Sequence, residues 1–305
     1  GSEMCIRDRY TSSLIYDIPI PGSLYAFGAQ VENAMEISNE GLELELQADI
    51  LRESAVSWRM KFNMARNWNR FEKSYSGKDV VDGDGTLLVV GRPLNGLYVW
   101  AHRGYYNSDA EVPRLYKIDG QEIYFNGVAT NGISGAVGDY RLLDLDGDGN
   151  PDSYYAGSPL PLAHGGWVNE LMWKNFDLNV LVNFTIGRKM INNRMGLGFS
   201  RQSEDGHLTK LFDYRKLRPW DGVNKKPNAP AWGNSLSMNT DSAIEKVHHL
   251  ALKQITLGYN LPDRISKKAG LSGVRFFLTA ENLFYLSNYS GGNPEVVNIY
   301  TGRDN

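Results

Sequence analysis

The stretch NFDLNVLVNFTIG at residues 175–187 alternates apolar and polar side chains almost without interruption. One side of this pattern holds Phe176, Leu178, Val180, Val182, Phe184 and Ile186. The other side holds Asp177, Asn179, Asn183 and Thr185. Because successive residues of a β-strand point to opposite faces of its sheet, the pattern predicts one long strand with an apolar and a polar face.

The same alternation recurs in four other stretches, and two weaker stretches accompany them. The four are GLELELQADI at 41–50, AVSWRMKFNMA at 55–65, KQITLGYNL at 253–261 and VRFFLTAEN at 274–282. Residues 167–173 predict a sixth strand and residues 24–31 a seventh. Several of these stretches reach about nine to eleven residues, which is the length that a tilted strand needs to cross a bilayer. We therefore expect an all-β, antiparallel fold.

The polar side of these strands carries ionisable residues, which need contact with water. They are Glu43, Glu45, Arg59, Lys61 and Asp177. In a soluble sheet such a face meets the surrounding water. In an outer-membrane barrel it lines the lumen, while the apolar face meets lipid. Alternation by itself fits both settings.

The lengths of the connections favour the membrane setting. Residues 51–55 and 174–175 form short links, whereas residues 72–166, 187–249 and 286–305 form very long ones. Bacterial outer-membrane barrels combine short periplasmic turns with long extracellular loops. Compact soluble domains seldom contain loops of that length. The pattern predicts a transmembrane β-barrel whose long loops lie outside the cell.

Composition excludes several other classes of protein. The chain has 305 residues and a formal net charge of -3, which does not indicate nucleic-acid binding. It lacks an apolar run of the roughly 18 residues that a transmembrane helix needs. Cys5 is the only cysteine, so an internal disulfide framework is excluded. Residues 1–9, GSEMCIRDR, show neither strand pattern nor signal peptide, and we interpret them as an artefact or non-native segment outside the fold.

The string DLDGDGNPD at 144–152 resembles a calcium-binding loop in its spacing of oxygen ligands. The candidate ligands are Asp144, Asp146, Asp148, Asn150 and Asp152. An EF-hand loop needs a bidentate Glu at position 12, where this chain has Tyr155, and it needs flanking helices. The string is therefore not an EF-hand. Two interpretations remain, namely a helix-free loop around one structural calcium and an Asp/Gly-rich turn between strands.

Aromatic residues in the long connections are candidate contacts for a solute or a partner protein. They are Trp100, Tyr105, Tyr106, Trp220 and Trp232. Aromatic rings are rigid amphipathic anchors that suit binding surfaces. The alternative is that these rings pack within their own loops.

Catalytic motifs are missing from the sequence. The five histidines do not show the H-E-x-x-H spacing, and the chain has no G-x-S-x-G, P-loop or Rossmann glycine pattern. We therefore expect a protein that is not an enzyme and that requires no cofactor, apart from the structural calcium considered above.

Five stretches together resemble the C-terminal barrel of the SusC/RagA family of TonB-dependent transporters. They are NEGLELEL at 39–46, GRPLNGLYVWAHRGYY at 91–106, GDYRLLDLDGDGNPD at 138–152, WKNFDLNVLVNFTIG at 173–187 and the stretch at 250–296, which begins LALKQITLGYNLP and continues with SGVRFFLTAENLFYLSNYSGGNPEV. Their order and spacing agree with the family after about residue 20. The chain departs from the family at SYYAGSPLPL and at His248-His249-Leu250.

The resemblance implies that residues 10–305 form part of a barrel, and that the plug, the TonB-contacting segment and the terminal strand lie outside this sequence. It implies import of an oligosaccharide or peptide across the bacterial outer membrane with a SusD-like surface lipoprotein, TonB and the surrounding lipid as partners. Two alternatives stay open from the residues. One is a secreted calcium-dependent β-sandwich that binds carbohydrate, and the other is a TonB-dependent receptor for a siderophore or vitamin.

Overall fold

A computed structural model of the chain describes most of its residues. The described ranges are 2–19, 29–52, 55–81, 87–112, 114–116, 122–124, 137–147, 152–192, 218–223, 226–231, 240–268, 270–296 and residue 302. The chain divides into two compact units. The sheet unit comprises 1–96, 158–189 and 246–289, and the loop unit comprises 97–157, 190–245 and 290–305.

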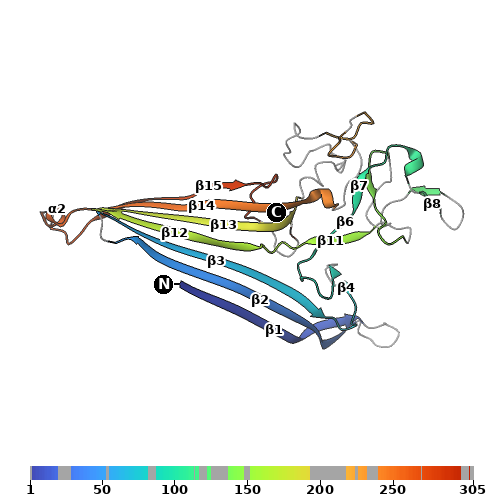
Figure 1. Cartoon of the computed structure of the whole chain (residues 1–305), viewed down its shortest axis with the longest axis horizontal. Coiled ribbons are helices and arrows are strands. Elements are labelled where there is room, and N and C mark those ends of the chain that lie inside the picture. Colours follow the sequence, from blue (N-terminus) through green and yellow to red (C-terminus); the bar gives the residue numbers. More distant parts are fainter. Residues whose placement is uncertain are drawn as a thin grey trace. The chain divides into compact units, whose positions relative to one another are not determined.

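A seven-stranded sheet in the order β1-β2-β3-β12-β13-β14-β15 dominates the fold (Figure 1). Its strands are β1 (Ser2–Pro19), β2 (Ala29–Leu51), β3 (Val56–Lys73), β12 (Ala163–Trp173), β13 (Phe176–Ile191), β14 (Ile244–Asn260) and β15 (Arg275–Ser287). The pairs β1–β2, β2–β3, β3–β12, β12–β13 and β14–β15 are antiparallel. The expected all-β antiparallel fold is confirmed.

Register keeps the two predicted faces separate from strand to strand. Trp167 lies opposite Phe62 on one side and Val182 on the other, so apolar residues align across β3, β12 and β13. Glu170 lies between Arg59 and Asn179 in the same way. Since a slip of one residue would exchange the faces, this register is what preserves the segregation.

The strands exceed the predicted bounds at several ends, and β1 was not predicted. Residues 2–9, which the sequence left outside the fold, pair in β1 with β2 from Ser2↔Leu46 to Arg9↔Asn39. Arg7, Asp8 and Arg9 are three consecutive charged residues, so the segment does not alternate apolar and polar side chains. Backbone hydrogen bonds between strands form without such alternation. Omitting this strand was wrong, while the non-native origin of residues 1–9 stays a prediction. Of the expected strand at 24–31, residues 29–31 open β2 and residues 24–28 lie outside the described residues.

The link between β14 and β15 contains one short helix, α2 (Asp263–Lys268). It follows Pro262, and its first turn holds Asp263 while its last turn holds Lys267 and Lys268, which is the charge order that a helix dipole favours. Among the described residues, no helix has both the length and the apolar character needed to cross a membrane.

Small strand pairs and 3-10 turns complete the described chain. In the sheet unit β4 (Val80–Val81) pairs with β5 (Leu87–Leu88). In the loop unit the strands are β6 (Leu97–Trp100), β7 (His102–Tyr105), β8 (Arg114–Tyr116), β9 (Glu122–Tyr124), β10 (Tyr140–Leu142) and β11 (Ser153–Gly157). The 3-10 turns are η1 (Asp109–Glu111) and η3 (Asp241–Ala243). Strand β6 pairs with β11, β7 with β10, and β8 with β9.

Buried apolar residues form small clusters within each unit. In the sheet unit Met35, Phe71, Val80 and Leu88 pack together. In the loop unit Leu97, Val99, Ile191 and Ala243 form one cluster, while Tyr140 and Ala229 form another. The long strands of the sheet unit keep much of their apolar side exposed, as Leu257 and Ile186 show.

Candidate functional sites

Ion pairs connect three strands on the polar face of the long sheet. Arg59 Nε lies 2.7 Å from Asp49 Oδ1, and Arg59 Nη1 lies 4.0 Å from Glu170 Oε2. Lys61 Nζ donates to Glu170 Oε1 at 3.0 Å. Alternation placed these side chains on one face, and cross-strand register brings the opposite charges together. Two predicted lumen residues, Arg59 and Lys61, thus balance the neighbouring carboxylates.

A second ion pair spans a whole strand. Arg275 Nη2 of β15 lies 2.5 Å from Asp177 Oδ2 of β13, with β14 between them. Gly258 of β14 leaves room for this contact, because a Cβ there would lie 2.5 Å from both carboxylate oxygens of Asp177. The sequence placed Asp177 on the polar face but did not predict its partner.

The carboxylates Glu43 and Glu45 lie on the same face, farther from the 174–175 turn. Glu43 pairs with the exposed Arg7 at 3.3 Å. Glu45 lies opposite Asn63, and in the described part of the chain it makes no ion pair. All five residues predicted to line a lumen therefore share one face of the sheet. Their position in a lumen stays a prediction.

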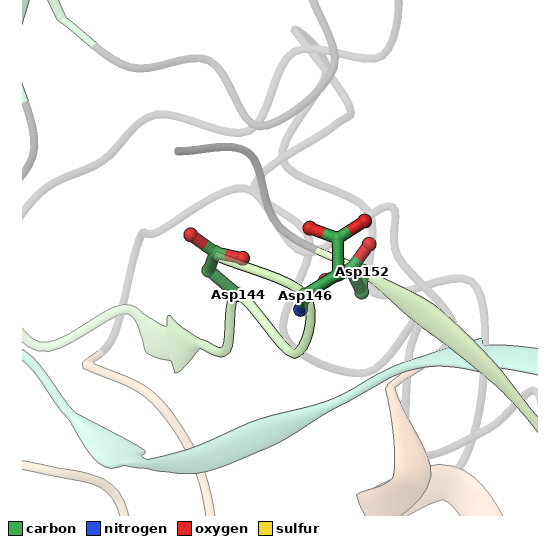
Figure 2. A group of neighbouring side chains, drawn as sticks. All are labelled: Asp144, Asp146 and Asp152. Carbon is green, nitrogen blue, oxygen red and sulfur yellow. Dashed lines mark hydrogen bonds between the residues drawn. The ribbon is translucent and has the colours of Figure 1, made fainter. Parts of the chain in front are cut away.

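The acidic loop brings three of its five predicted ligands together. Oxygen atoms of Asp144, Asp146 and Asp152 lie within 4.8 Å of one another, as the close-up shows (Figure 2). Asp144 and Asp146 are exposed and Asp152 is half-buried. Asp148 and Asn150 lie outside the described residues. Three converging carboxylates match the hard oxygen donors that calcium prefers.

Backbone hydrogen bonds already shape this loop. The amide of Leu145 donates to Asp152 Oδ2 at 2.5 Å, and the amide of Gly147 donates to Asp144 Oδ1 at 2.6 Å. Gly147 has φ +85°, which glycine adopts without strain. These are the contacts of an Asp/Gly turn, so both sequence interpretations fit the geometry. Calcium binding stays a prediction.

Two of the five candidate aromatic residues pack within the loop unit. Tyr106 is buried, and Tyr105 stacks on Tyr140 with ring centroids 5.3 Å apart. Burial raises the pKa of Tyr105, Tyr106 and Tyr140 above the ordinary tyrosine value. This packing favours the structural interpretation of Tyr105 and Tyr106.

Trp100 and Trp220, the two candidate tryptophans among the described residues, contact other segments of the loop unit. Trp220 Nε1 donates to Asn107 Oδ1 at 3.2 Å. Its ring lies over Gly138, where a Cβ would come within 2.7 Å of Trp220 Cε3. Trp100 pairs with Ser153 and forms a bridge with Thr240. Trp232 lies outside the described residues. Contact of these rings with a solute or partner stays a prediction.

Sequence reasoning missed a polar cluster around η3. His102 Nδ1 contacts Asp241 Oδ1, and Tyr154 donates from its hydroxyl to Asp241 Oδ2 at 3.3 Å. Ser242 Oγ donates to the hydroxyl of the buried Tyr140 at 2.8 Å. The Tyr140 ring lies edge-on to His102, with centroids 4.5 Å apart. The partners of Asp241 and Ser242 lie 87 to 139 residues away in sequence, so only the fold could reveal them.

The chain was compared with family models, with curated proteins and with solved structures. No family model matches the chain. TonB-dependent receptor P3 of Formosa agariphila is 24% identical over 93% of this chain, and receptor P26 of the same organism is 27% identical over 95%. TonB-dependent receptor SusC of Bacteroides thetaiotaomicron is 25% identical over 94%. This chain is similar to TonB-dependent receptors, SusC among them.

The chain spans less than a third of these receptors, namely 28%, 29% and 27% of their lengths. Among solved structures, it matches a chain of the RagAB peptide transporter with a TM-score of 0.69 and 23% identity. That match covers 96% of this chain and 30% of the other. A second match, to the RagAB peptide importer in its open-open state, has a TM-score of 0.69 at 21% identity. These structures establish that the chain has the fold of part of a RagAB transporter chain.

Proposed function

We propose that this TonB-dependent receptor imports a nutrient, either an oligosaccharide or a peptide, across the bacterial outer membrane. The sheet unit supplies barrel wall, and the loop unit supplies part of the extracellular surface. A SusD-like lipoprotein acts as the partner at that surface, and TonB supplies energy through parts of the receptor outside this chain. The relatives are named receptors, transporter and importer, which supports a role without catalysis or a required cofactor.

One observation carries this proposal, namely the opposite chemistry of the two sheet faces. Ion pairs and carboxamides occupy one face, as described above. On the other face Leu257, Phe276 and Leu278 are 47%, 61% and 72% exposed. Exposing such side chains to water costs roughly 25 cal/mol per Å² of apolar surface. A bilayer removes this cost, whereas the polar face suits a hydrated lumen.

The secreted β-sandwich is the weaker alternative. A sandwich buries the apolar face of one sheet against a second sheet about 10 Å away. In the described ranges the long strands form a single seven-stranded sheet, and the fold is similar to that of a RagAB transporter chain. The siderophore or vitamin receptor shares this barrel architecture, so the two transport alternatives differ in the solute alone.

Fractionation of the full-length receptor in native membranes tests the proposal. We expect the receptor in the outer-membrane fraction, and a band on a denaturing gel that shifts between unheated and boiled samples. Affinity purification in mild detergent should also retain a surface lipoprotein. An unshifted protein in the soluble fraction contradicts the proposal. Uptake assays with peptides, oligosaccharides and ferric siderophores then separate the solute classes.

A further inference from the structure

The apolar face of the sheet ends in a row of aromatic rings beside the 174–175 turn. Register pairs Trp173 of β12 with Phe176 of β13, and Tyr259 of β14 with Phe276 of β15. The Phe176 ring contacts two of the others, with centroids 6.2 Å from Trp173 and 4.6 Å from Tyr259. Four successive strands thus each contribute one ring, and we name these four residues the aromatic row. Strands β12 and β13 have neighbours on both sides, so the 48% exposure of Trp173 and the 42% exposure of Phe176 do not come from a sheet edge.

The apolar face has a second boundary farther along β3. From Val56, which is in register with the aromatic row, apolar side chains continue on this face as far as Met64. Arg66 and Trp68 follow on the same face, with the guanidinium carbon 5.3 Å from the ring centroid. The indole of Trp68 donates to Glu40 of β2 at 2.6 Å. The apolar band therefore has aromatic rings at both of its ends.

The height of this band fits the apolar layer of an outer membrane. Val56 and Arg66 lie ten residues apart, which is roughly 33 Å along a strand at about 3.3 Å per residue. Strands of outer-membrane barrels tilt by about 35–45°, so this length covers roughly 25 Å of membrane thickness. Such barrels carry an apolar band of about 25 Å between two aromatic girdles. The aromatic row thus corresponds to one membrane interface, and Arg66 with Trp68 corresponds to the other.

Basic side chains gather beside the aromatic row. Lys174 is exposed, and its Nζ lies 5.0 Å from the ring centroid of Trp173. The link from β14 to β15, residues 261–274, contains three basic residues and one acidic residue, Asp263. The basic residues of the link, all exposed, are Arg264, Lys267 and Lys268. The basic residues of the turn and the link together outnumber the single carboxylate, which favours contact with an anionic partner.

Hydrogen bonds join this link to the 174–175 turn. The amide of Asn260 donates to the carbonyl oxygen of Asn175 at 2.8 Å, and Asn175 Nδ2 donates to the carbonyl oxygen of Asn260 at 2.7 Å. The amide of Leu261 donates to the carbonyl oxygen of Val274 at 2.8 Å, which closes the link. Helix α2 lies beyond the ends of β14 and β15 (Figure 1). The four basic residues therefore share the end of the sheet that carries the aromatic row.

Exposed apolar side chains accompany these basic residues. Ile265 of α2 is 51% exposed and Leu271 is 50% exposed. In water such exposure is unfavourable in proportion to the apolar area. At a membrane interface the same side chains reach the acyl region, while the stems of lysine and arginine carry their charges to the headgroups. The link therefore has the composition of a segment that lies at a membrane surface.

We propose that the aromatic row, Lys174 and the basic residues of the 261–274 link form a binding surface for anionic phospholipids. The rings lie at the level of the headgroups, and the ammonium and guanidinium groups contact the lipid phosphates. This inference rests on the proposed function for its barrel setting, and it adds a lipid partner on the outside of the wall. At the other interface the carboxylate of Glu40 lies beside Trp68, which makes that end less attractive to anions.

Native mass spectrometry of the full-length receptor in neutral detergent tests this surface. The probes are dioleoylphosphatidylglycerol and dioleoylphosphatidylcholine, which have the same acyl chains and differ in net charge. One variant is Lys174→Gln, and the other combines Lys267→Gln with Lys268→Gln. Lys78→Gln is the control, because Lys78 is an exposed lysine of the same unit that lies between β3 and β4. The heat-shifted gel band verifies that each variant forms a closed barrel.

We expect the native receptor and the control to bind phosphatidylglycerol more tightly than phosphatidylcholine. Each lysine removed from the surface should weaken phosphatidylglycerol binding about fivefold and leave phosphatidylcholine binding unchanged. Equal phosphatidylglycerol affinity in all heat-shifted proteins overturns this surface, while the barrel and the proposed function stand. An equal loss for both lipids overturns recognition of the anionic headgroup. A full-length receptor that is soluble and shows no heat shift contradicts the proposed function together with this surface.

Discussion

Glycine residues determine which polar side chains can reach across the sheet. Asn67 lies over Gly41, Asn183 over Gly166, and the Asp177–Arg275 pair over Gly258. In each case an added Cβ would come within 2.7 Å of a polar side-chain atom. Each glycine thus lowers strand propensity but leaves space for a polar side chain of a neighbouring strand, and at Gly258 this space holds an ion pair between the two strands on either side. The sequence shows the glycines, but their partners follow only from the register.

Calcium binding is the prediction that belongs to single residues of the acidic loop. We predict that Asp146→Asn and Asp152→Asn each weaken calcium binding by the full-length receptor about tenfold, because each removes one hard anionic ligand. Titration calorimetry with calcium alone measures the effect. Asp263→Asn, in the exposed α2 helix, is the control and should leave binding unchanged. Equal calcium affinity in all four proteins would leave the Asp/Gly turn as the correct interpretation.

At the scale of elements, alternation predicted which segments form strands, but it did not predict where those strands begin and end. The stretches at 41–50 and 55–65 were predicted from their patterns, yet β2 and β3 continue to Ala29 and Lys73. Their outer parts lose the strict alternation, and Phe71 is buried there against Met35, Val80 and Leu88. Contact with neighbouring segments stabilises these ends, so local pattern alone could not predict them.

The loop unit depends on a tyrosine cluster that sequence could not reveal. Tyr140 joins β10 to η3 through Ser242, and it stacks on Tyr105 of β7. Each of these contacts connects segments separated by a long stretch of chain. The sequence named Tyr105 as a candidate ligand contact, with packing inside its loop as the alternative, and it did not single out Tyr140. Their shared burial shows instead how β7, β10 and η3 are held together.

This cluster predicts that the loop unit loses stability in alkaline solution. Burial raises the pKa of Tyr140 above the unfolded value of 10.0, so the folded state keeps its proton where the unfolded state releases it. Stability from this source is therefore complete below about pH 10 and falls as the pH rises further. Subtilisin cleavage of the loops in the full-length receptor, measured from pH 8 to pH 11, should accelerate above about pH 10.

A variant separates this effect from general alkaline damage. Tyr140→Phe lacks the ionisable group and also the hydroxyl that accepts from Ser242. We expect faster cleavage than native at pH 8, where a hydrogen bond worth about 1 kcal/mol is missing, but a shallower increase above pH 10. Tyr75→Phe, at an exposed position of the sheet unit, should behave like the native protein. A pH dependence equal in all three proteins excludes a role for Tyr140.

At the scale of the whole molecule, one alternating sequence pattern produces a sheet with a polar face and an apolar face. The polar face combines the ion pairs of Arg59, Lys61 and Arg275 with the carboxamides of Asn63 and Asn183. The apolar face of β3, β12 and β13 carries aromatic rings and includes the carboxamide of Asn169, whose oxygen accepts from Trp58 Nε1 at 3.3 Å. Sequence alone predicted the faces, because alternation encodes them directly. It could not predict the rows, because the offset between strands depends on the assembled sheet.

Neighbouring positions in β13 provide a direct test of how the sheet faces its surroundings. Val180 and Asn179 adjoin in sequence but point to opposite faces. If the apolar face meets lipid, Val180→Lys places a charge near the bilayer midplane and destabilises the full-length receptor by about 2–4 kcal/mol. Asn179→Lys places the same charge on the polar face, beside Glu170, and should cost much less. The temperature at which the folded gel band converts to the unfolded one, measured in outer-membrane preparations, reports both effects. Equal losses for the two variants, or a larger loss for Asn179→Lys, would contradict the assignment of the apolar face to lipid and of the polar face to the lumen.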